Sequence, residues 1–308
     1  MPDYLIHKAV DLAKVNKVRR AVLSQPGYLD RTYMGQAKYD GCNVIFILTV
    51  AGEQDKVLSR TGEAVPSMYW LLPYMHKVFA HLVMEFGGAV ILGEAWKEGV
   101  PFAEISGRFR KKSIDSDLGV RVFDVLSLAE YDAGVSNVPY IERYARVISG
   151  GYVAQPMDIR AACTHFSPST TGHSDWQGWC NALKARGGYD GLILRDPEGA
   201  WTRGNGTNGE IIKLKPVLSF DLRVIGLEEG KGKHAGRLGA IVVSFGDREL
   251  RVGTGFTDAE RREYWDEGLN LIGAIVEVEA MDFSADGLLR EPRFKGVRFD
   301  KLEADHVG

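Results

Sequence analysis

Cysteine is scarce in this chain, and its placement argues against two kinds of small domain. The three residues Cys42, Cys163 and Cys180 are far apart and form no Cys-x-x-Cys pair. Zinc sites need closely spaced ligands, and disulfide frameworks need an even set of cysteines in a short chain. We therefore expect reduced thiols and a cytoplasmic location.

Long apolar runs are also missing. The most apolar window, residues 68–92, is interrupted by Pro73, by several charged or polar side chains and by Gly87-Gly88. A membrane-spanning helix needs about 20 consecutive apolar residues. The first residues, Met1-Pro2-Asp3-Tyr4, do not resemble the charged start of a signal peptide. We expect no membrane contact, and in this window a buried helix followed by a strand.

The chain also lacks a large excess of charge of either sign. The formal net charge is −3, so the chain as a whole does not attract a polyanion. Residues from 217 onward are more acidic than residues 1–216. We expect any nucleic-acid surface to consist of local basic patches, mainly in the amino-terminal part.

The composition that remains is sufficient for two globular domains. A chain of 308 residues with 45% hydrophobic residues can bury two cores. Before Pro216, mixed strands and helices favour an α+β domain, whereas short β-rich runs between Gly-rich turns after it predict a small barrel with one helix. The predicted strands are 43–50, 89–95, 121–126, 191–195, 219–227, 238–245, 249–253 and 274–280, and the predicted helices are 4–23, 67–85, 138–149, 175–186 and 259–268.

One lysine is placed where it can act as a nucleophile. The segment Ala37-Lys38-Tyr39-Asp40-Gly41 presents a primary amine at a predicted turn before strand 43–50. Alone, it is an ordinary Asp-Gly turn. An amine that attacks phosphorus also needs cations for the phosphoryl oxygens. Lys213 and Lys215 are two apart in an apolar run, so both would point from the same face and can supply that charge.

Further segments follow in a fixed order along the chain. They are Ser59-Arg60-Thr61-Gly62, Leu92-Gly93-Glu94-Ala95, Val122-Phe123-Asp124, Asp190-Gly191-Leu192-Ile193, Lys213-Leu214-Lys215-Pro216 and Arg298-Phe299-Asp300-Lys301. With the Lys38 segment, the set resembles the covalent nucleotidyltransferase superfamily, and within it the small bacteriophage ATP-dependent DNA ligases, over nearly the whole chain. The resemblance implies an ATP-grasp-like adenylation (nucleotidyltransferase) domain over residues 1–216 and an oligonucleotide/oligosaccharide-binding (OB) barrel over residues 217–308.

The resemblance also assigns roles to residues at the matching positions. Lys38 would form a lysyl-AMP intermediate. The implied catalytic set is Lys38, Asp40, Lys213 and Lys215, and the implied ATP contacts are Gln36, Ala37, Arg60, Glu94, Phe123, Arg298 and Lys301. Within that set, Phe123 would stack on adenine, while Arg298 and Lys301 would orient the departing pyrophosphate. Glu94 and Asp190 would hold Mg²⁺ or Mn²⁺.

Two positions depart from the family pattern. Asp190 stands where relatives usually have Glu, and its side chain is one methylene shorter. Both carboxylates are hard oxygen ligands, but the shorter one puts direct metal contact in doubt. Asn43 stands where many relatives have Arg. That replacement removes a guanidinium that can bind phosphate with two hydrogen bonds.

The implied activity is the sealing of 5′-phosphate/3′-hydroxyl nicks, with nicked duplex DNA and ATP as partners and a monomeric enzyme. Basic side chains are candidates for contacts to DNA phosphates, namely Arg60, Arg110, Lys111, Lys112, Arg203, Lys231 and Lys233. Alternatives are an RNA ligase or an mRNA-capping guanylyltransferase, which share the lysyl-nucleotide chemistry. A non-catalytic nucleic-acid-binding OB module is a more distant one.

Overall fold

The computed structural model describes residues 4–152, 158–266, 271–284 and 286–306. The chain divides into two compact units, one ending at Lys215 and the other starting at Pro216. Each unit has its own apolar core. We refer to them as unit 1 and unit 2.

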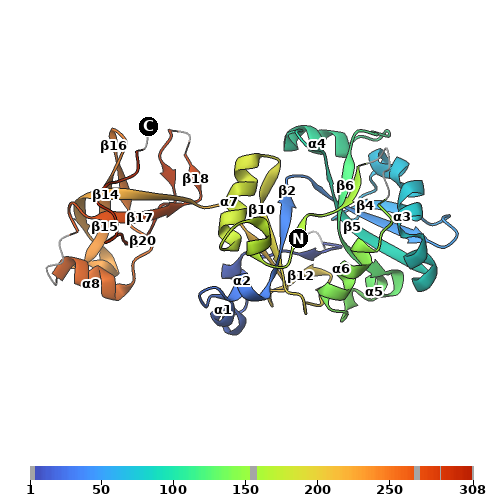
Figure 1. Cartoon of the computed structure of the whole chain (residues 1–308), viewed down its shortest axis with the longest axis horizontal. Coiled ribbons are helices and arrows are strands. Elements are labelled where there is room, and N and C mark those ends of the chain that lie inside the picture. Colours follow the sequence, from blue (N-terminus) through green and yellow to red (C-terminus); the bar gives the residue numbers. More distant parts are fainter. Residues whose placement is uncertain (1–3, 153–157, 267–270, 285, 307–308) are drawn as a thin grey trace. The chain divides into compact units, whose positions relative to one another are not determined.

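Unit 1 contains two main antiparallel sheets (Figure 1). In the first, the strand order is β13-β10-β2-β9, with β2 at Met34–Tyr39, β9 at Thr164–His165, β10 at Tyr189–Arg195 and β13 at Ile211–Leu214. In the second, the order is β4-β3-β5-β6-β8, with β3 at Cys42–Thr49, β4 at Lys56–Ser59, β5 at Gly88–Trp96, β6 at Gly119–Ser127 and β8 at Ile159–Ala161. Only β8 runs parallel to its neighbour among these pairings.

Helices cover both sheets because each presents an apolar stripe. Helix α7, Trp176–Arg186, packs on β10 through Trp176, Trp179, Cys180 and Leu183, and Asp175 caps its amino end by accepting from the Gly178 N–H at 2.7 Å. Helices α3, Leu72–Phe86, and α6, Tyr140–Ile148, pack on the second sheet. The remaining elements are η1 (Leu12–Lys14), α1 (Lys17–Leu23), α2 (Tyr28–Thr32), η2 (Pro66–Leu71), α4 (Phe102–Phe109), α5 (Leu128–Ala133), η3 (Pro168–Thr171) and the short strand pairs β1 (His7–Lys8) with β12 (Gly204–Asn205) and β7 (Val135–Ser136) with β11 (Trp201–Thr202).

The prediction of one helix over residues 4–23 is wrong in its first half. His7 and Lys8 form strand β1, paired in parallel with Gly204 and Asn205. The Val10 N–H donates to the carbonyl of Ile211 at 3.0 Å, and its carbonyl accepts from the Lys213 N–H at 2.9 Å. Backbone groups at the start of this segment therefore pair with a distant sheet edge, and the helical residues are those of η1 and α1.

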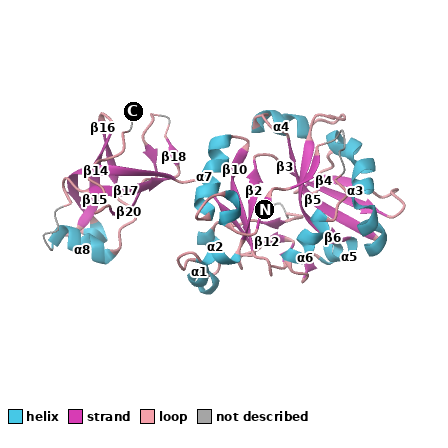
Figure 2. Cartoon of the chain, in the orientation of Figure 1, coloured by secondary structure: helices cyan, strands magenta, loops and turns pink. Residues whose placement is uncertain are grey.

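Unit 2 is a small β-rich body with the strand order β16-β15-β14-β17-β20. Its strands are β14 (Leu218–Glu229), β15 (Leu238–Phe245), β16 (Arg248–Val252), β17 (Ile275–Ala280) and β20 (Arg293–Val297), with a separate pair β18 (Asp282–Phe283) and β19 (Leu289–Arg290) and the short turn η4 (Gly232–His234). An isolated bridge joins Thr254, which follows β16, to Arg293 of β20, so the ends of the two outer strands come together. Helix α8, Asp258–Asp266, packs on β15 (Figure 2). The predicted end of this helix at residue 268 lies outside the described residues.

Candidate active site

A cavity in unit 1 lies between the two sheets and collects most of the predicted nucleotide contacts. About 140 Å³ of it is accessible to water. Gln36, Ala37 and Lys38 come from β2, whereas Glu94 and Phe123 come from β5 and β6. Its lining is completed by Ile6, His7, Ala9, Tyr39, Asn43, Ala162, Ile193, Arg195 and Ile211. The two sheets thus bring together residues that are far apart in sequence.

Lys38 lies inside strand β2 rather than in a turn, which corrects the predicted location. Its neighbour Tyr39 is buried and packs against Trp96 and Tyr189, with ring centroids 5.0 and 5.3 Å away. Side chains alternate along a strand, so Lys38 and Gln36 share the face opposite to that of the Tyr39 side chain, and both line the cavity. The turn comes at Asp40-Gly41. A Cβ on Gly41 would lie 2.4 Å from the Ala95 carbonyl oxygen, so glycine permits the close approach of β5.

Asp190 contacts the Lys38 side chain directly. The pairing of β10 with β2 shifts register between Tyr189 and Gly191, and Gly191 has φ of 125°, a conformation that favours glycine. This bulge sets Asp190 outside the regular ladder, where its Oδ2 accepts a hydrogen bond from Lys38 Nζ. The amine is therefore oriented by a carboxylate from the neighbouring strand.

Glu94 is a cavity carboxyl group whose pKa is shifted mainly by burial. It lies opposite Asn43 in the β3–β5 pairing. Burial raises the pKa of Glu94 to about 7, although Lys38, the Asn43 amide and Arg60 act in the opposite direction. Asn43 can give this carboxylate a hydrogen bond but no positive charge. Its own buried Oδ1 has no hydrogen-bond partner within the described structure.

Lys213 and Lys215 lie at the neighbouring strand. Lys213 is on β13 opposite Ile193, and its Nζ is 3.4 Å from Asp11 Oδ1. Lys215 follows the last residue of β13 and is exposed. Their spacing of two residues is the spacing of side chains that share a strand face. Neither lysine is part of the cavity lining.

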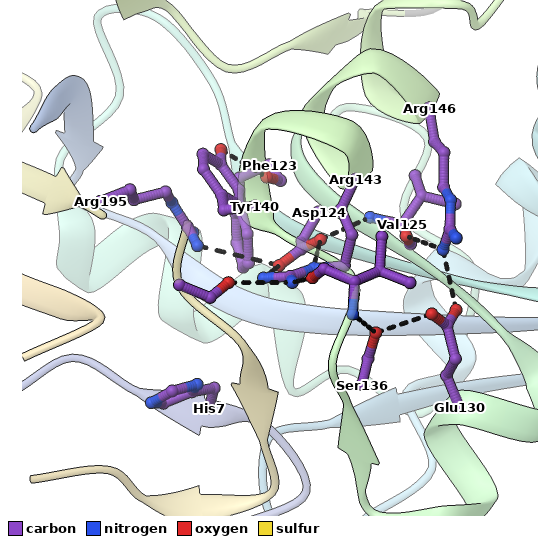
Figure 3. A network of polar contacts seen from close by, with 12 residues as sticks. His7, Phe123, Asp124, Val125, Glu130, Ser136, Tyr140, Arg143, Arg146 and Arg195 are labelled. Carbon is purple, nitrogen blue, oxygen red and sulfur yellow. Dashed lines mark hydrogen bonds and ion pairs between the residues drawn. The ribbon is translucent and has the colours of Figure 1, made fainter. Parts of the chain in front are cut away.

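A buried polar network behind the cavity was not found by sequence reasoning (Figure 3). Asp124 and Arg143 form an ion pair with Nε to Oδ1 at 3.0 Å, and both side chains are 1% exposed. Arg195 donates from Nε to Gln36 Oε1 at 3.0 Å, and Tyr140 donates to the Phe123 carbonyl at 3.0 Å. The one available signal was that an arginine directly follows the apolar run Leu192 to Leu194.

His7 is a second cavity residue that sequence reasoning missed. It is buried, and its Nδ1 accepts from the Thr202 N–H at 3.1 Å. Burial lowers the pKa of His7 to about 4, so its imidazole is neutral near pH 7. Because the segment had been predicted as helix, nothing in the pattern connected His7 with residues around 204.

The predicted DNA contacts in unit 1 have different surroundings. Arg60 is exposed and lies over the Tyr4 ring, 5.5 Å from its centroid. Arg110 donates to Ser106 Oγ at 2.5 Å, Lys111 pairs with Asp115 at 2.7 Å, and Lys112 is exposed. Arg203 is held on the Tyr131 ring at 4.7 Å and donates to the Tyr131 carbonyl.

In unit 2, the predicted pyrophosphate contacts are already paired. Arg298 Nη1 donates to both carboxylate oxygens of Asp221 at 3.0 and 3.1 Å, and its Nε and Nη2 donate to Asp300 at 2.9 Å. Lys301 also donates to Asp221. The Arg298 hydrogen bonds lower the pKa of Asp300 to about 2. Lys231 and Lys233, at η4, are exposed.

The described residues also bear on membrane and metal binding. Within the described ranges, no helix is both long and apolar enough to span a membrane. The same part of the chain contains no group of three or more His, Cys, Asp or Glu side chains arranged to hold a metal. A metal at Glu94 and Asp190 would therefore depend on further ligands, such as water or phosphate oxygens.

Comparison with known proteins gives consistent results for both units. The profile of a family described as "ATP dependent DNA ligase domain" matches residues 12–215, and that of a "DNA ligase OB-like domain" matches residues 229–298. The DNA ligase of Halobacterium salinarum is 26% identical over 332 residues, covering 94% of this chain and 56% of that protein. The DNA ligase of Methanothrix thermoacetophila is 31% identical over 288 residues, covering 81% and 49%. This chain spans about half the length of these relatives.

A solved structure supports the same fold. The ATP-dependent DNA ligase from bacteriophage T7, in complex with ATP, is 19% identical and superposes with a TM-score of 0.55, covering 95% of this chain and 98% of that one. At this identity the likeness concerns the fold. Together with the family profiles, it confirms the predicted class, an α+β nucleotidyltransferase domain followed by an OB barrel.

Proposed function

This chain belongs to the family of ATP-dependent DNA ligases, and from that membership we propose that it seals nicks in duplex DNA through a covalent lysyl-AMP intermediate. The observation that carries the proposal is the cavity between the two sheets, which gathers Lys38, Glu94 and Phe123. We assign residues 1–216 to the adenylation domain and residues 217–308 to the OB domain.

The reaction has three steps, and in each one a bond forms at phosphorus while another breaks. First, the neutral amine of Lys38 attacks the α-phosphate of ATP, an N–P bond forms, pyrophosphate leaves and the amine gives up a proton. Next, the 5′-phosphate of the nick takes AMP from Lys38, which breaks the N–P bond. Finally, the 3′-hydroxyl attacks that phosphate and AMP departs.

Residues around Lys38 prepare it for the first step. Asp190 contacts Nζ and orients it, so this contact must be released before the lone pair can attack. Phe123 supplies an aromatic face for adenine, and Gln36 and Ala37 border the same cavity. Lys213 and Lys215 would stabilise charge on the α-phosphate, with Asp40 in a supporting catalytic role. Arg60, Arg298 and Lys301 would bind the phosphate side of ATP.

The proposed metal is Mg²⁺ or Mn²⁺, held by Glu94 and Asp190. Their carboxylate oxygens are the hard donors such ions prefer. Burial raises the pKa of Glu94, and a divalent ion beside the carboxylate would favour its charged form. When bound, the ion neutralises charge on phosphoryl oxygens.

For DNA, we propose a cytoplasmic monomer that contacts phosphates with scattered cations. These are Arg60, Arg110, Lys111, Lys112, Arg203, Lys231 and Lys233. Arg203 would have to leave the Tyr131 ring to do so. The three free cysteines support a reducing compartment.

The test uses the full chain with α-labelled ATP and a nicked duplex. Retention of label on the protein and its transfer to the 5′-end of DNA are expected, followed by a sealed strand. Sealing of an RNA substrate alone, or labelling by GTP rather than ATP, would favour the RNA ligase or capping alternatives. No retained label from either nucleotide would point to a non-catalytic module.

A further inference from the structure

We propose that Arg195 is a positioning residue which, with Tyr140 and Thr164, fixes the side-chain amide of Gln36 so that only its oxygen can accept a bond from a nucleotide base. We call Arg195, Tyr140 and Thr164 the amide lock. The inference deepens the proposed function, on which it rests, because it names the device that makes the cavity select adenine over guanine.

The oxygen side of the amide is fixed by Arg195. A guanidinium has donors and no acceptor, so the Gln36 atom that meets its Nε at 3.0 Å must be the carbonyl oxygen Oε1. Glutamine oxygen and nitrogen can otherwise exchange places by a flip of the amide. The arginine thus removes one of two possible orientations.

The nitrogen side is fixed by two hydroxyl groups that have already used their protons. Gln36 Nε2 donates to Tyr140 OH at 3.1 Å and to Thr164 Oγ1 at 2.9 Å. Tyr140 donates its own proton to the Phe123 carbonyl at 3.0 Å, and Thr164 donates to the Ala162 carbonyl at 2.9 Å. Toward Gln36, both hydroxyls can therefore only accept. Both hydrogens of the amide nitrogen are consumed.

Arg195 is itself held on several sides. It is 4% exposed, and its guanidinium carbon lies 4.6 Å from the Tyr140 ring centroid and 5.0 Å from that of Phe123. Its Nη1 is 3.9 Å from Asp124, which Arg143 fixes from the other side (Figure 3). Contact with both rings is the arrangement of a cation–π pair. Arg195 therefore ties the orientation of Gln36 to the position of the proposed stacking residue.

The consequence is an acceptor-only surface at one point of the cavity. Gln36 faces the cavity with Lys38, and the hydrogen-bonding capacity left to it is the second lone pair of Oε1. Adenine presents an amino group at its six-position, and guanine presents a carbonyl oxygen there. Adenine can donate to Oε1, whereas guanine would place two acceptors against each other in a desolvated site.

The experiment compares Arg195→Met with Arg195→Lys. Formation of labelled protein adduct is measured from α-labelled ATP and GTP across nucleotide concentration, so that KM and kcat are separated. We expect Arg195→Met to lower the ATP-to-GTP ratio of kcat/KM by about tenfold or more, mainly through KM, because a freed amide can turn its donor to the cavity. Lysine has donors only, so Arg195→Lys should keep most of the preference.

Controls separate the possible failures. Circular dichroism checks that each variant is folded, and Thr164→Val, which removes one acceptor and leaves Arg195 in place, should cause a smaller drop. Calorimetric binding of ATP and GTP to Lys38→Ala and to Lys38→Ala/Arg195→Met gives the same ratio without chemistry. An unchanged ratio in folded Arg195→Met would overturn the inference. Absence of adduct in the wild type would overturn the proposed function, and the binding ratio would still test Arg195.

Discussion

Each unit contains a bidentate arginine–aspartate pair, which is buried in unit 1 and exposed to water in unit 2. In unit 1, Arg143 meets Asp124 with Nε and Nη2 at 3.0 and 3.3 Å, and both side chains are 1% exposed. In unit 2, Arg298 meets Asp300 at 2.9 Å through the same two nitrogens, with 29% and 66% exposure. Water competes for the second pair, so Arg298 can exchange Asp300 for another anion while its Nη1 stays on Asp221. The first is a fixed part of the scaffold.

This contrast matches the proposed work of the two units. In the proposed reaction, the cavity of unit 1 keeps its shape through three different steps. In the proposed reaction, the cations of unit 2 act when pyrophosphate departs and are released afterwards. An exposed ion pair, which water can break, suits the releasable cations of unit 2. A buried ion pair suits the fixed cavity of unit 1.

The largest effect is expected at the reagent itself. Lys38→Ala should abolish the labelled adduct, because no other amine is oriented by Asp190 within the described cavity. The fold should persist, since the Lys38 side chain is 29% exposed. Gel transfer of label with circular dichroism measures both, and an adduct that survives in this variant would refute the assignment.

The next largest effect concerns the stability of the buried pair. Arg143→Met leaves Asp124 without its main cation, and the loss of one partner of a buried pair costs about 3–5 kcal/mol. Urea unfolding is followed by tryptophan fluorescence, which reports on unit 1 because every tryptophan except Trp265 lies there.

The matched control for that measurement is Arg298→Met. Its pair with Asp300 is exposed, and Asp221 keeps Lys301 as a cationic partner, so the urea midpoint of unit 2, followed through Trp265 or by hydrogen exchange, should move far less. Equal shifts in the two variants would remove the contrast between scaffold and releasable pairs.

A third prediction uses the raised pKa of Glu94. Its ordinary value is 4.5 and its folded value is about 7, so the native state binds a proton more tightly than the unfolded state. The free energy of unfolding should therefore fall as pH rises from 4.5 to about 7. Glu94→Gln should lack this loss when urea midpoints are compared at pH 5 and pH 8. A wild-type midpoint that rises relative to the variant over that range would contradict the raised pKa.

Divalent metal sharpens the same prediction. If Glu94 holds the ion, added Mg²⁺ should stabilise the wild type at pH 8 more than at pH 5, because only the ionised carboxylate is a ligand. Glu94→Gln should show little response at either pH. A response of equal size in the variant would place the ion elsewhere.

A fourth prediction concerns the releasable cations. Replacing Arg298 and Lys301 with Ala should slow self-adenylation far more than sealing of a pre-adenylated nick, since pyrophosphate leaves in the first step only. Single-turnover assays on both substrates measure the two rates. Equal loss in both would mean that these side chains act on DNA.

The smallest effect is expected from the basic patch at Arg110, Lys111 and Lys112. Each neutralised phosphate contributes about −0.9 to the slope of log K against log salt. Lys111 is already paired with Asp115 and Arg110 with Ser106. Changing all three to Ser should therefore flatten the slope for nick binding by at most about two, with adenylation unaffected. An unchanged slope would mean that these three side chains do not contact DNA phosphates, and Lys231 and Lys233 would be tested next.

Hydrophobic periodicity and capping residues predicted those helices and strands whose conformation depends on residues close in sequence. The strand at 238–245 and the helix at 175–186 have clear periodicity and caps, and the structure places β15 and α7 there. The segment 4–23 was mispredicted because residues around 204–213 decide its conformation. Lys38 was found through its motif. Arg195 and Tyr140 were not, because their contacts with Gln36 join residues more than 100 positions apart.

The pairing of β1 with β12 bears on how the protein is made. One wall of the cavity is formed by Ile6, His7 and Ala9, and this segment is fixed by backbone bonds to Gly204, Ile211 and Lys213. A ribosome adds residues in order, so these backbone partners of the wall emerge about two hundred residues after the wall itself. Strands β3, β5 and β6 can pair much earlier, since their contacts are closer in sequence. The nascent chain should therefore acquire the Glu94 sheet first and a closed nucleotide cavity late in the synthesis of unit 1.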